Sequence, residues 1–70
     1  MNIDIRNYGH YRVTSHGGRS YDLFNRRNDK VYSITAGDFR AINLAAQVSE
    51  PRVEEICLAI ERDLAARVVP

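Results

Sequence analysis

Apolar and polar residues alternate through the first half of the chain. Ile3 and Ile5 alternate with the polar Asp4 and Arg6, and the same period of two recurs around residues 11–14, 20–23 and 31–34. A period of two that is carried by β-branched and aromatic residues predicts half-buried β-strands. Each strand is therefore expected to place its apolar side chains on one face of a sheet.

Turn-forming residues separate these segments. The stretches SHGGRS (residues 15–20) and NRRND (residues 25–29) contain Gly, Asn and Asp, which adopt the backbone conformations that hairpin turns require. Gly9 interrupts the first segment, and the pattern leaves open whether residues 2–15 form one bent strand or two short ones. Counting that segment as one strand, we expect a meander of three antiparallel strands.

The apolar period changes to that of a helix after residue 35. Thr35 and Asp38 have the spacing of a capping box, which predicts a helix from about residue 36 to about residue 48. Its polar residues share one narrow face, so we expect it to be covered on more than one side. Ser49 and Pro51 predict the start of a second helix, which extends to about residue 67. The apolar stripe of this second helix comprises Val53, Ile56, Cys57, Ile60, Leu64 and Val68.

These elements predict an α+β fold in which a three-stranded antiparallel meander is followed by two C-terminal helices packed on one face (β-β-β-α-α). The 70 residues are expected to form a single compact domain, with residues 1–35 as the meander and residues 36–68 as the helical layer. A core of this size supplies only about 3–5 kcal/mol of net stability. Chains this small often gain stability from a partner.

The single cysteine, Cys57, excludes an internal disulfide and fits a reducing compartment, so we expect a cytoplasmic protein. The N-terminal stretch lacks the apolar region of a signal peptide. The uninterrupted apolar runs, such as Leu44-Ala45-Ala46 and residues 56–60, are far short of the roughly 20 residues that a membrane span needs. We therefore expect no association with a membrane.

No pattern in the sequence specifies a reaction. Gly17-Gly18 could form a phosphate-binding loop, but such a loop leads into a helix, and here a strand pattern follows. His16, Ser20 and Asp22 lie in or beside a hairpin turn, which offers no oxyanion hole. His10 and His16 have no third metal ligand at a recognisable spacing.

The sequence also favours structural roles for Cys57 and for the carboxylates of the second helix. Cys57 falls in the apolar stripe, which favours a small buried side chain over a nucleophile. The carboxylates Glu54, Glu55, Glu61 and Asp63 are expected to form a solvated acidic face of the second helix. We expect a protein without a cofactor or a metal, and not an enzyme.

Basic and aromatic residues are concentrated in the first 40 residues. That part carries seven basic and four acidic groups, a net charge of +3, whereas residues 41–70 carry three basic and five acidic groups, or −2. Arginine and tyrosine are common anchors of protein interfaces. The candidate partner-binding residues are Arg12, Arg19, Tyr21, Arg26, Arg27 and Lys30.

The second helix carries another apolar line, roughly opposite its main stripe. It could be a set of scattered surface residues, which are common, or a contact for a second copy or another protein. The residues of this possible self-association surface are Leu58, Arg62, Ala65 and Val69.

The function these features favour is a small protein-binding module, an inhibitor or regulator that occupies a surface of a larger protein or nucleoprotein complex. Phage-encoded inhibitors of host machinery, including anti-CRISPR proteins, are analogous in size and style alone. The alternative is a regulator that binds nucleic acid directly through a basic sheet face. Such domains typically have a pI above about 9, whereas this sequence has a pI of 7.9.

Residues 30–67 resemble a ribbon-helix-helix repressor in the order of a short strand, a helix of about three turns and a longer helix. The resemblance implies a dimer in which strands pair between two chains and place residues in the major groove. The outward residues would be Val31 and Ser33, or Tyr32 and Ile34. The preceding residues predict a hairpin, however, so we expect the strand at 31–34 to pair within its own chain.

Overall fold

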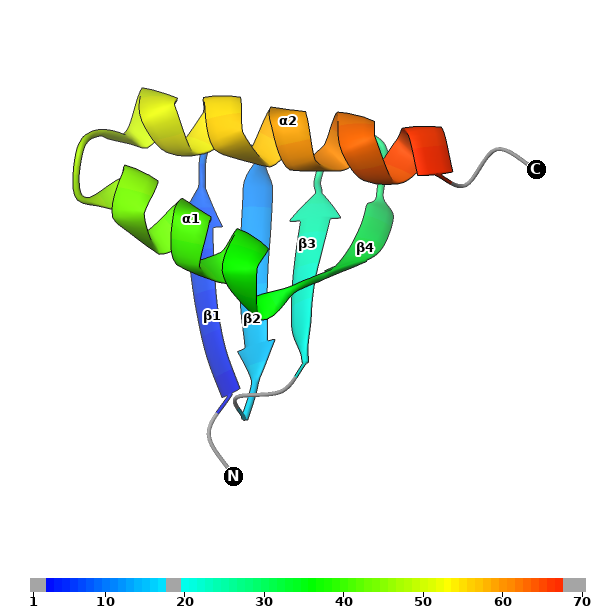
Figure 1. Ribbon diagram of the computed structural model, residues 1–70, viewed down its shortest axis with the longest axis horizontal. Helices are drawn as coiled ribbons and strands as arrows, with labels where there is room; N and C mark the ends of the chain where they lie inside the picture. The colour runs from blue at the N-terminus through cyan, green and yellow to red at the C-terminus, as the bar shows by residue number, and fades with distance from the viewer. Residues whose placement is uncertain (1–2, 18–19, 68–70) are drawn as a thin grey trace.

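The structure, a computed structural model, describes residues 3–17 and 20–67 and shows a two-layer α+β fold (Figure 1). One antiparallel sheet contains four strands in the order β1-β2-β3-β4, and two helices follow it. The elements are β1 (Ile3–Tyr8), β2 (Tyr11–His16), β3 (Tyr21–Asn25), β4 (Lys30–Ile34), α1 (Ala36–Ala46) and α2 (Glu50–Arg67). The α+β class and the two C-terminal helices are confirmed, but the expected number of three strands is wrong.

The fourth strand arises from a tight turn at Gly9. Tyr8 and Tyr11 are paired across β1 and β2, so only Gly9 and His10 form the loop. Gly9 has a φ of +58°, and glycine with positive φ at the first loop position is typical of a type II′ hairpin turn. A two-residue loop leaves no polar stretch in the sequence, which is why the segment resembled one interrupted strand.

This turn also decides which way β1 faces. Cross-strand partners point to the same side of a sheet, and side chains alternate along each strand. Tyr8 therefore shares the face of Tyr11, which is almost fully buried. Ile3 and Ile5 are an odd number of residues from Tyr8, so they project from the opposite face.

The two remaining connections are hairpins as well. His16 donates its backbone N–H to the Ser20 carbonyl across 2.8 Å, and Gly17 has a φ of +76°. Gly17 thus belongs to a strand-to-strand turn and not to a phosphate-binding loop, whereas Gly18 lies outside the described residues. Residues 26–29 connect β3 to β4, which pair within this chain as the sequence predicted.

Local capping explains where both helices begin. The backbone N–H of Asp38 donates to Thr35 Oγ1 at 3.0 Å, and Asp38 Oδ2 accepts the Thr35 N–H at 3.3 Å, which confirms the capping box. The α2 helix starts beside Ser49, whose Oγ accepts the Arg52 N–H at 3.3 Å. Pro51 sits in the first turn of α2, where the missing backbone donor has little consequence.

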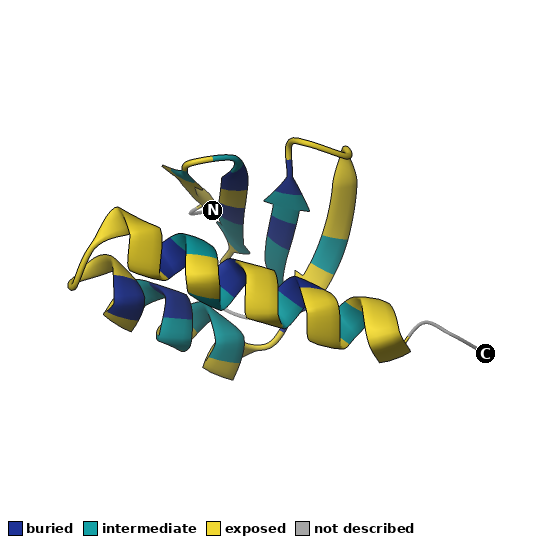
Figure 2. Cartoon of the chain, turned by 90° about the horizontal axis from the view of Figure 1, so that it is seen from above, coloured by how far each residue is buried: buried dark blue, intermediate teal, exposed yellow. Residues whose placement is uncertain are grey.

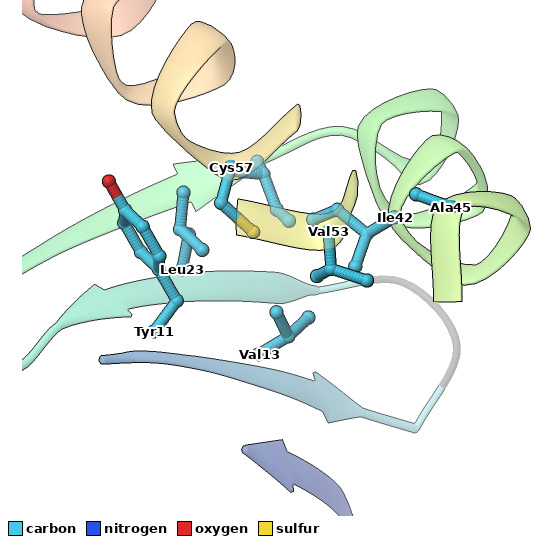
Figure 3. Packing of buried hydrophobic residues seen from close by; sticks show 8 residues of the cluster. Tyr11, Val13, Leu23, Ile42, Ala45, Val53 and Cys57 are labelled. Carbon is cyan, nitrogen blue, oxygen red and sulfur yellow. The ribbon is translucent and has the colours of Figure 1, made fainter. Parts of the chain in front are cut away.

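The core lies between the helices and one face of the sheet (Figure 3). Its buried members are Tyr11, Val13, Leu23, Ile34, Ile42, Ala45, Val53 and Cys57. Buried and half-buried positions form a stripe along the inner side of α2, and the outer side is exposed (Figure 2). The expectation that α1 is covered on more than one side is confirmed, because α1 packs against α2 and also against the sheet, where Phe39 stacks on Tyr21. Leu44 and Val48 stay exposed on the remaining side of α1.

Candidate functional site

The face of the sheet away from the helices has no second layer over it among the described residues. We call it the open face. Its residues follow from the strand pairing and are Ile3, Ile5, Asn7, Arg12, Thr14, His16, Asp22, Phe24, Val31 and Ser33. The opposite side, which packs against α1 and α2, is the covered face.

Large apolar side chains are exposed on the open face. Ile3, Ile5 and Val31 have 56%, 55% and 60% of their surface exposed, and Phe24 is half-buried. Phe24 and Val31 are cross-strand partners, while Ile3 and Ile5 follow each other on the same side of β1. The open face thus carries two apolar pairs with polar side chains between them, a mixture typical of protein interfaces.

Arg12 lies across the middle of this face. Its guanidinium carbon is 5.6 Å from the centre of the Phe24 ring, and its Nε donates to Asn7 Oδ1 at 3.3 Å. A guanidinium over an aromatic ring gains about 0.5–1 kcal/mol at an exposed site. Arg12 is one of the contact residues predicted from the sequence, and in the structure it lies beside the apolar pair of Phe24 and Val31.

The other basic candidates lie at one end of the sheet. Arg26 is held in place, because its Nη2 donates to the Gly9 carbonyl and its backbone N–H donates to the His10 carbonyl at 2.8 Å. Arg27 and Lys30 are exposed in and beside the same hairpin loop. Arg19 lies outside the described residues. Arg26, Arg27 and Lys30 do not form the basic sheet face expected from the sequence.

Tyr21 points to the covered face. Its ring stacks on Phe39 of α1, with centroids 4.6 Å apart and planes inclined by 29°. Tyr21 also packs against the buried core. The structure therefore separates this candidate from Arg12.

The apolar line on α2 is exposed where the structure describes it. Leu58 is 41% exposed, and Arg62 and Ala65 are also exposed, whereas Val69 lies outside the described residues. Leu58 borders a groove of about 520 Å³ between α2 and the hairpin ends, together with His10, Arg27, Pro51, Glu54 and Glu55. Leu58 is thus one wall of a groove rather than the centre of a flat patch.

The expectation that Glu61 is exposed to solvent is wrong. It was assigned to the solvated face of α2, yet only 8% of its surface is exposed. Tyr11 donates its hydroxyl to Glu61 Oε1 at 2.8 Å, and Asn25 Nδ2 lies 3.0 Å from both carboxylate oxygens. The signal was present in the spacing, because Glu61 follows the fully buried Cys57 by four residues and Val53 by eight.

The surroundings of Glu61 favour its ionised form. Burial is the largest single influence and would raise the pKa of this carboxyl, but hydrogen bonds from four side chains together hold the pKa below its ordinary value. The donors are Asn25, Tyr11, Asn28 and Tyr32. The same contact and burial raise the pKa of Tyr11. This cluster joins α2 to β2, β3 and the last hairpin, so it is a structural link.

His16 and Asp22 meet on the open face. His16 Nε2 lies 2.8 Å from Asp22 Oδ2, beside a shallow depression of about 380 Å³ that Ser20 and Ser33 also line. In a catalytic triad, the carboxylate orients the histidine and the second ring nitrogen faces the nucleophile. The structure gives His16 and Asp22 an exposed ion-pair geometry. Within residues 3–17 and 20–67, no three His, Cys, Asp or Glu side chains are placed to hold a metal.

Cys57 is buried in the core, as expected. Burial, with a smaller influence from the carboxylates of Glu54 and Glu61, raises the pKa of its thiol to about 12. A thiol that remains protonated at neutral pH is a poor nucleophile. Cys57 therefore acts as a packing residue.

Comparison with protein-family models, with curated proteins and with solved structures found no match for this chain. The described helices include none with the length and apolar character needed to cross a lipid bilayer.

Proposed function

We propose that the chain is a non-enzymatic protein-binding module that regulates or inhibits a larger partner by covering part of its surface with the open face. The observation that carries this proposal is the exposure of Ile3, Ile5 and Val31 on that face. These residues belong to two apolar pairs at opposite edges of the face, with polar side chains between them, and large exposed apolar side chains set among polar groups are a mark of interaction sites. Arg12, stacked on Phe24, supplies an anchor of the type that dominates binding energy in protein interfaces.

The nucleic-acid alternative draws less support from these contacts. Of the candidate cations that the structure describes, only Arg12 belongs to the open face. Arg26 is engaged with Gly9, and Asp22 adds a carboxylate to the same face. A surface that follows a phosphate backbone needs several free cations along its length. The open face is suited instead to an apolar patch on a protein, with an acidic group opposite Arg12.

The test compares two charged substitutions of equally exposed residues. Val31→Glu alters the open face, while Leu44→Glu alters α1 on the helical side and serves as the matched control. Tagged wild-type and variant proteins are used to capture partners from a lysate of the source cell, and the captured proteins are quantified. We expect a protein that binds the wild type and Leu44→Glu but is reduced at least about tenfold with Val31→Glu.

A titration with nonspecific DNA and RNA at two salt concentrations completes the test. Binding to phosphates weakens steeply as salt rises, whereas binding through an apolar centre does not. The proposal fails if the purified chain binds nucleic acid at micromolar concentration with a steep salt dependence. It also fails if Leu44→Glu removes the captured protein and Val31→Glu does not.

A further inference from the structure

Strand β1 is an edge of the sheet with no covering element on its outer side among the described residues. It pairs only with β2, and residues 3–7 are all exposed. Proteins commonly protect such edges with lysine, proline or a bulge. The six residues of β1, IDIRNY, contain neither lysine nor proline, and their register with β2 is uninterrupted.

The hairpin fixes which backbone groups of β1 are free. The residues that flank a two-residue loop, Tyr8 and Tyr11, form a hydrogen-bonded pair, and the pattern alternates along an antiparallel ladder. Residues 4, 6 and 8 therefore direct their N–H and C=O groups toward β2. Residues 3, 5 and 7 direct theirs outward, where a further strand can pair with them.

The charges of β1 are complementary to themselves. Asp4 and Arg6 project on the covered-face side, and Arg6 Nη2 lies 3.1 Å from Asp4 Oδ2 with both side chains about half exposed. If a second β1 lies antiparallel with Ile5 opposite Ile5, Asp4 of each copy faces Arg6 of the other. In this register Ile3 faces Asn7, and all the outward backbone groups of residues 3, 5 and 7 find partners.

We propose that two copies of this chain associate through β1 in this single register and form a continuous eight-stranded antiparallel sheet. The neighbouring registers are disfavoured by charge. A shift of two residues one way places Asp4 opposite Asp4, and a shift the other way places Arg6 opposite Arg6. Like charges directly opposite destabilise a strand pair, and opposite charges stabilise it. Asp4 and Arg6 thus block the general pairing of an edge strand while permitting one partner.

The dimer has a defined form. The twofold axis passes midway between the two Ile5 residues and is perpendicular to the sheet. Both helical layers therefore lie on the same side of the sheet. The two open faces become one surface, with Ile3 and Ile5 of both copies at its centre. This inference does not depend on what else binds the open face, because it rests on the edge of β1.

The experiment measures molar mass by light scattering during size exclusion, with the loaded concentration raised from about 10 µM to about 1 mM, the range suited to a small interface. We expect the mass to rise from 8.0 kDa toward twice that value. Arg6→Asp and Asp4→Arg each place two like-charged pairs at the interface, and each is expected to weaken association at least about tenfold. Circular dichroism checks that both variants are folded.

Mixing the two variants gives the decisive result. In a mixed dimer, the two arginines of Asp4→Arg face the two aspartates of Arg6→Asp, so the pair should associate although neither variant does so alone. The double variant carrying both changes restores complementarity and should also dimerise. Failure of the mixture to associate, while the wild type does, excludes this register.

Two further variants separate β1 from other surfaces. Ile5→Pro removes an outward N–H that plays no part in the β1–β2 ladder, so it should abolish the dimer while leaving the monomer folded. Leu58→Glu changes the exposed line on α2 and should leave the dimer intact. A chain that stays monomeric up to about 1 mM, or a dimer lost with Leu58→Glu and kept with Ile5→Pro, overturns the proposal.

Discussion

The covered and open faces of the sheet are built from the same strands, and they meet different surroundings. On the covered face, Tyr11, Val13 and Leu23 are at most 1% exposed. On the open face, Ile5 and Val31 are more than half exposed, although their side chains are equally suited to a core. The difference lies in the two helices and in the Gly9 turn that orients β1. Apolar character therefore identifies residues capable of burial, and the topology selects which of them are buried.

The largest effect that distinguishes the two faces is expected from truncating one core residue. Leu23→Ala should cost about 3 kcal/mol of unfolding free energy, because it removes buried contacts and leaves a cavity. Val31→Ala should cost less than about 0.5 kcal/mol, since its side chain is already in water. Urea unfolding followed by circular dichroism measures both. Similar losses at the two positions would show that the open face is covered in solution.

A second contrast concerns carboxylates on the two sides of α2. Glu61→Ala leaves the Tyr11 hydroxyl and the Asn25 amide without their acceptor, and should cost about 2 kcal/mol. Glu55→Ala is the control, because the Glu55 side chain is 67% exposed and makes a surface ion pair with Arg52 at 3.3 Å. The control should change stability by less than about 0.5 kcal/mol. Equal effects in the same unfolding measurement would remove the structural role assigned to Glu61.

Much of the fold could be predicted because its signals are local. The capping box at Thr35 and Asp38, the Ser49 cap and the 3.6-residue stripe of α2 each depend on residues within one or two turns. The period of two likewise identified the strand-forming segments, although not the turn that divides β1 from β2. The two-layer arrangement follows from these elements, since an apolar sheet face and two amphipathic helices must cover one another.

The errors came from interactions between distant residues. The orientation of Ile3 and Ile5 depends on the Tyr8–Tyr11 pairing, which an isolated glycine in the sequence does not reveal. Glu61 is buried because Asn25 and Tyr11, 36 and 50 residues away, donate to it. The expected contact residues do not share one face, because Arg26 donates a hydrogen bond to the Gly9 carbonyl and Tyr21 stacks on Phe39. The spacing of residues along the chain does not determine on which of the two faces a long polar side chain lies.

The two glycine turns provide a smaller contrast between a covered end and an open end of the sheet. Gly9 and Gly17 both have positive φ, so alanine at either position introduces backbone strain of about 1 kcal/mol. At Gly9 a Cβ would also collide with the Glu54 side chain of α2, whereas a Cβ at Gly17 would meet no atom of the described residues within 4 Å apart from its chain neighbours. Because the Glu54 carboxylate is the end of a flexible side chain and can move aside, Gly9→Ala should destabilise the protein only slightly more than Gly17→Ala, by less than about 1 kcal/mol in thermal or urea unfolding. Equal losses would indicate that the first hairpin does not rest on α2.

The smallest expected effect is the acid dependence that the covered face gives to stability. The pKa of Glu61 is lower in the folded chain than its ordinary value of 4.5, so the unfolded chain binds the proton first as pH falls. The stabilisation is complete above about pH 4.5 and is lost progressively as pH falls through the lowered folded value. Glu61→Gln removes this titration, so the difference in unfolding free energy between wild type and variant should shrink between pH 6 and pH 3, a window around the ordinary glutamate value of about 4.3. A difference between wild type and Glu61→Gln that stays constant from pH 6 to pH 3, a window around the ordinary glutamate value of about 4.3, would contradict the assignment of Glu61 as the acid-sensitive group of the covered face.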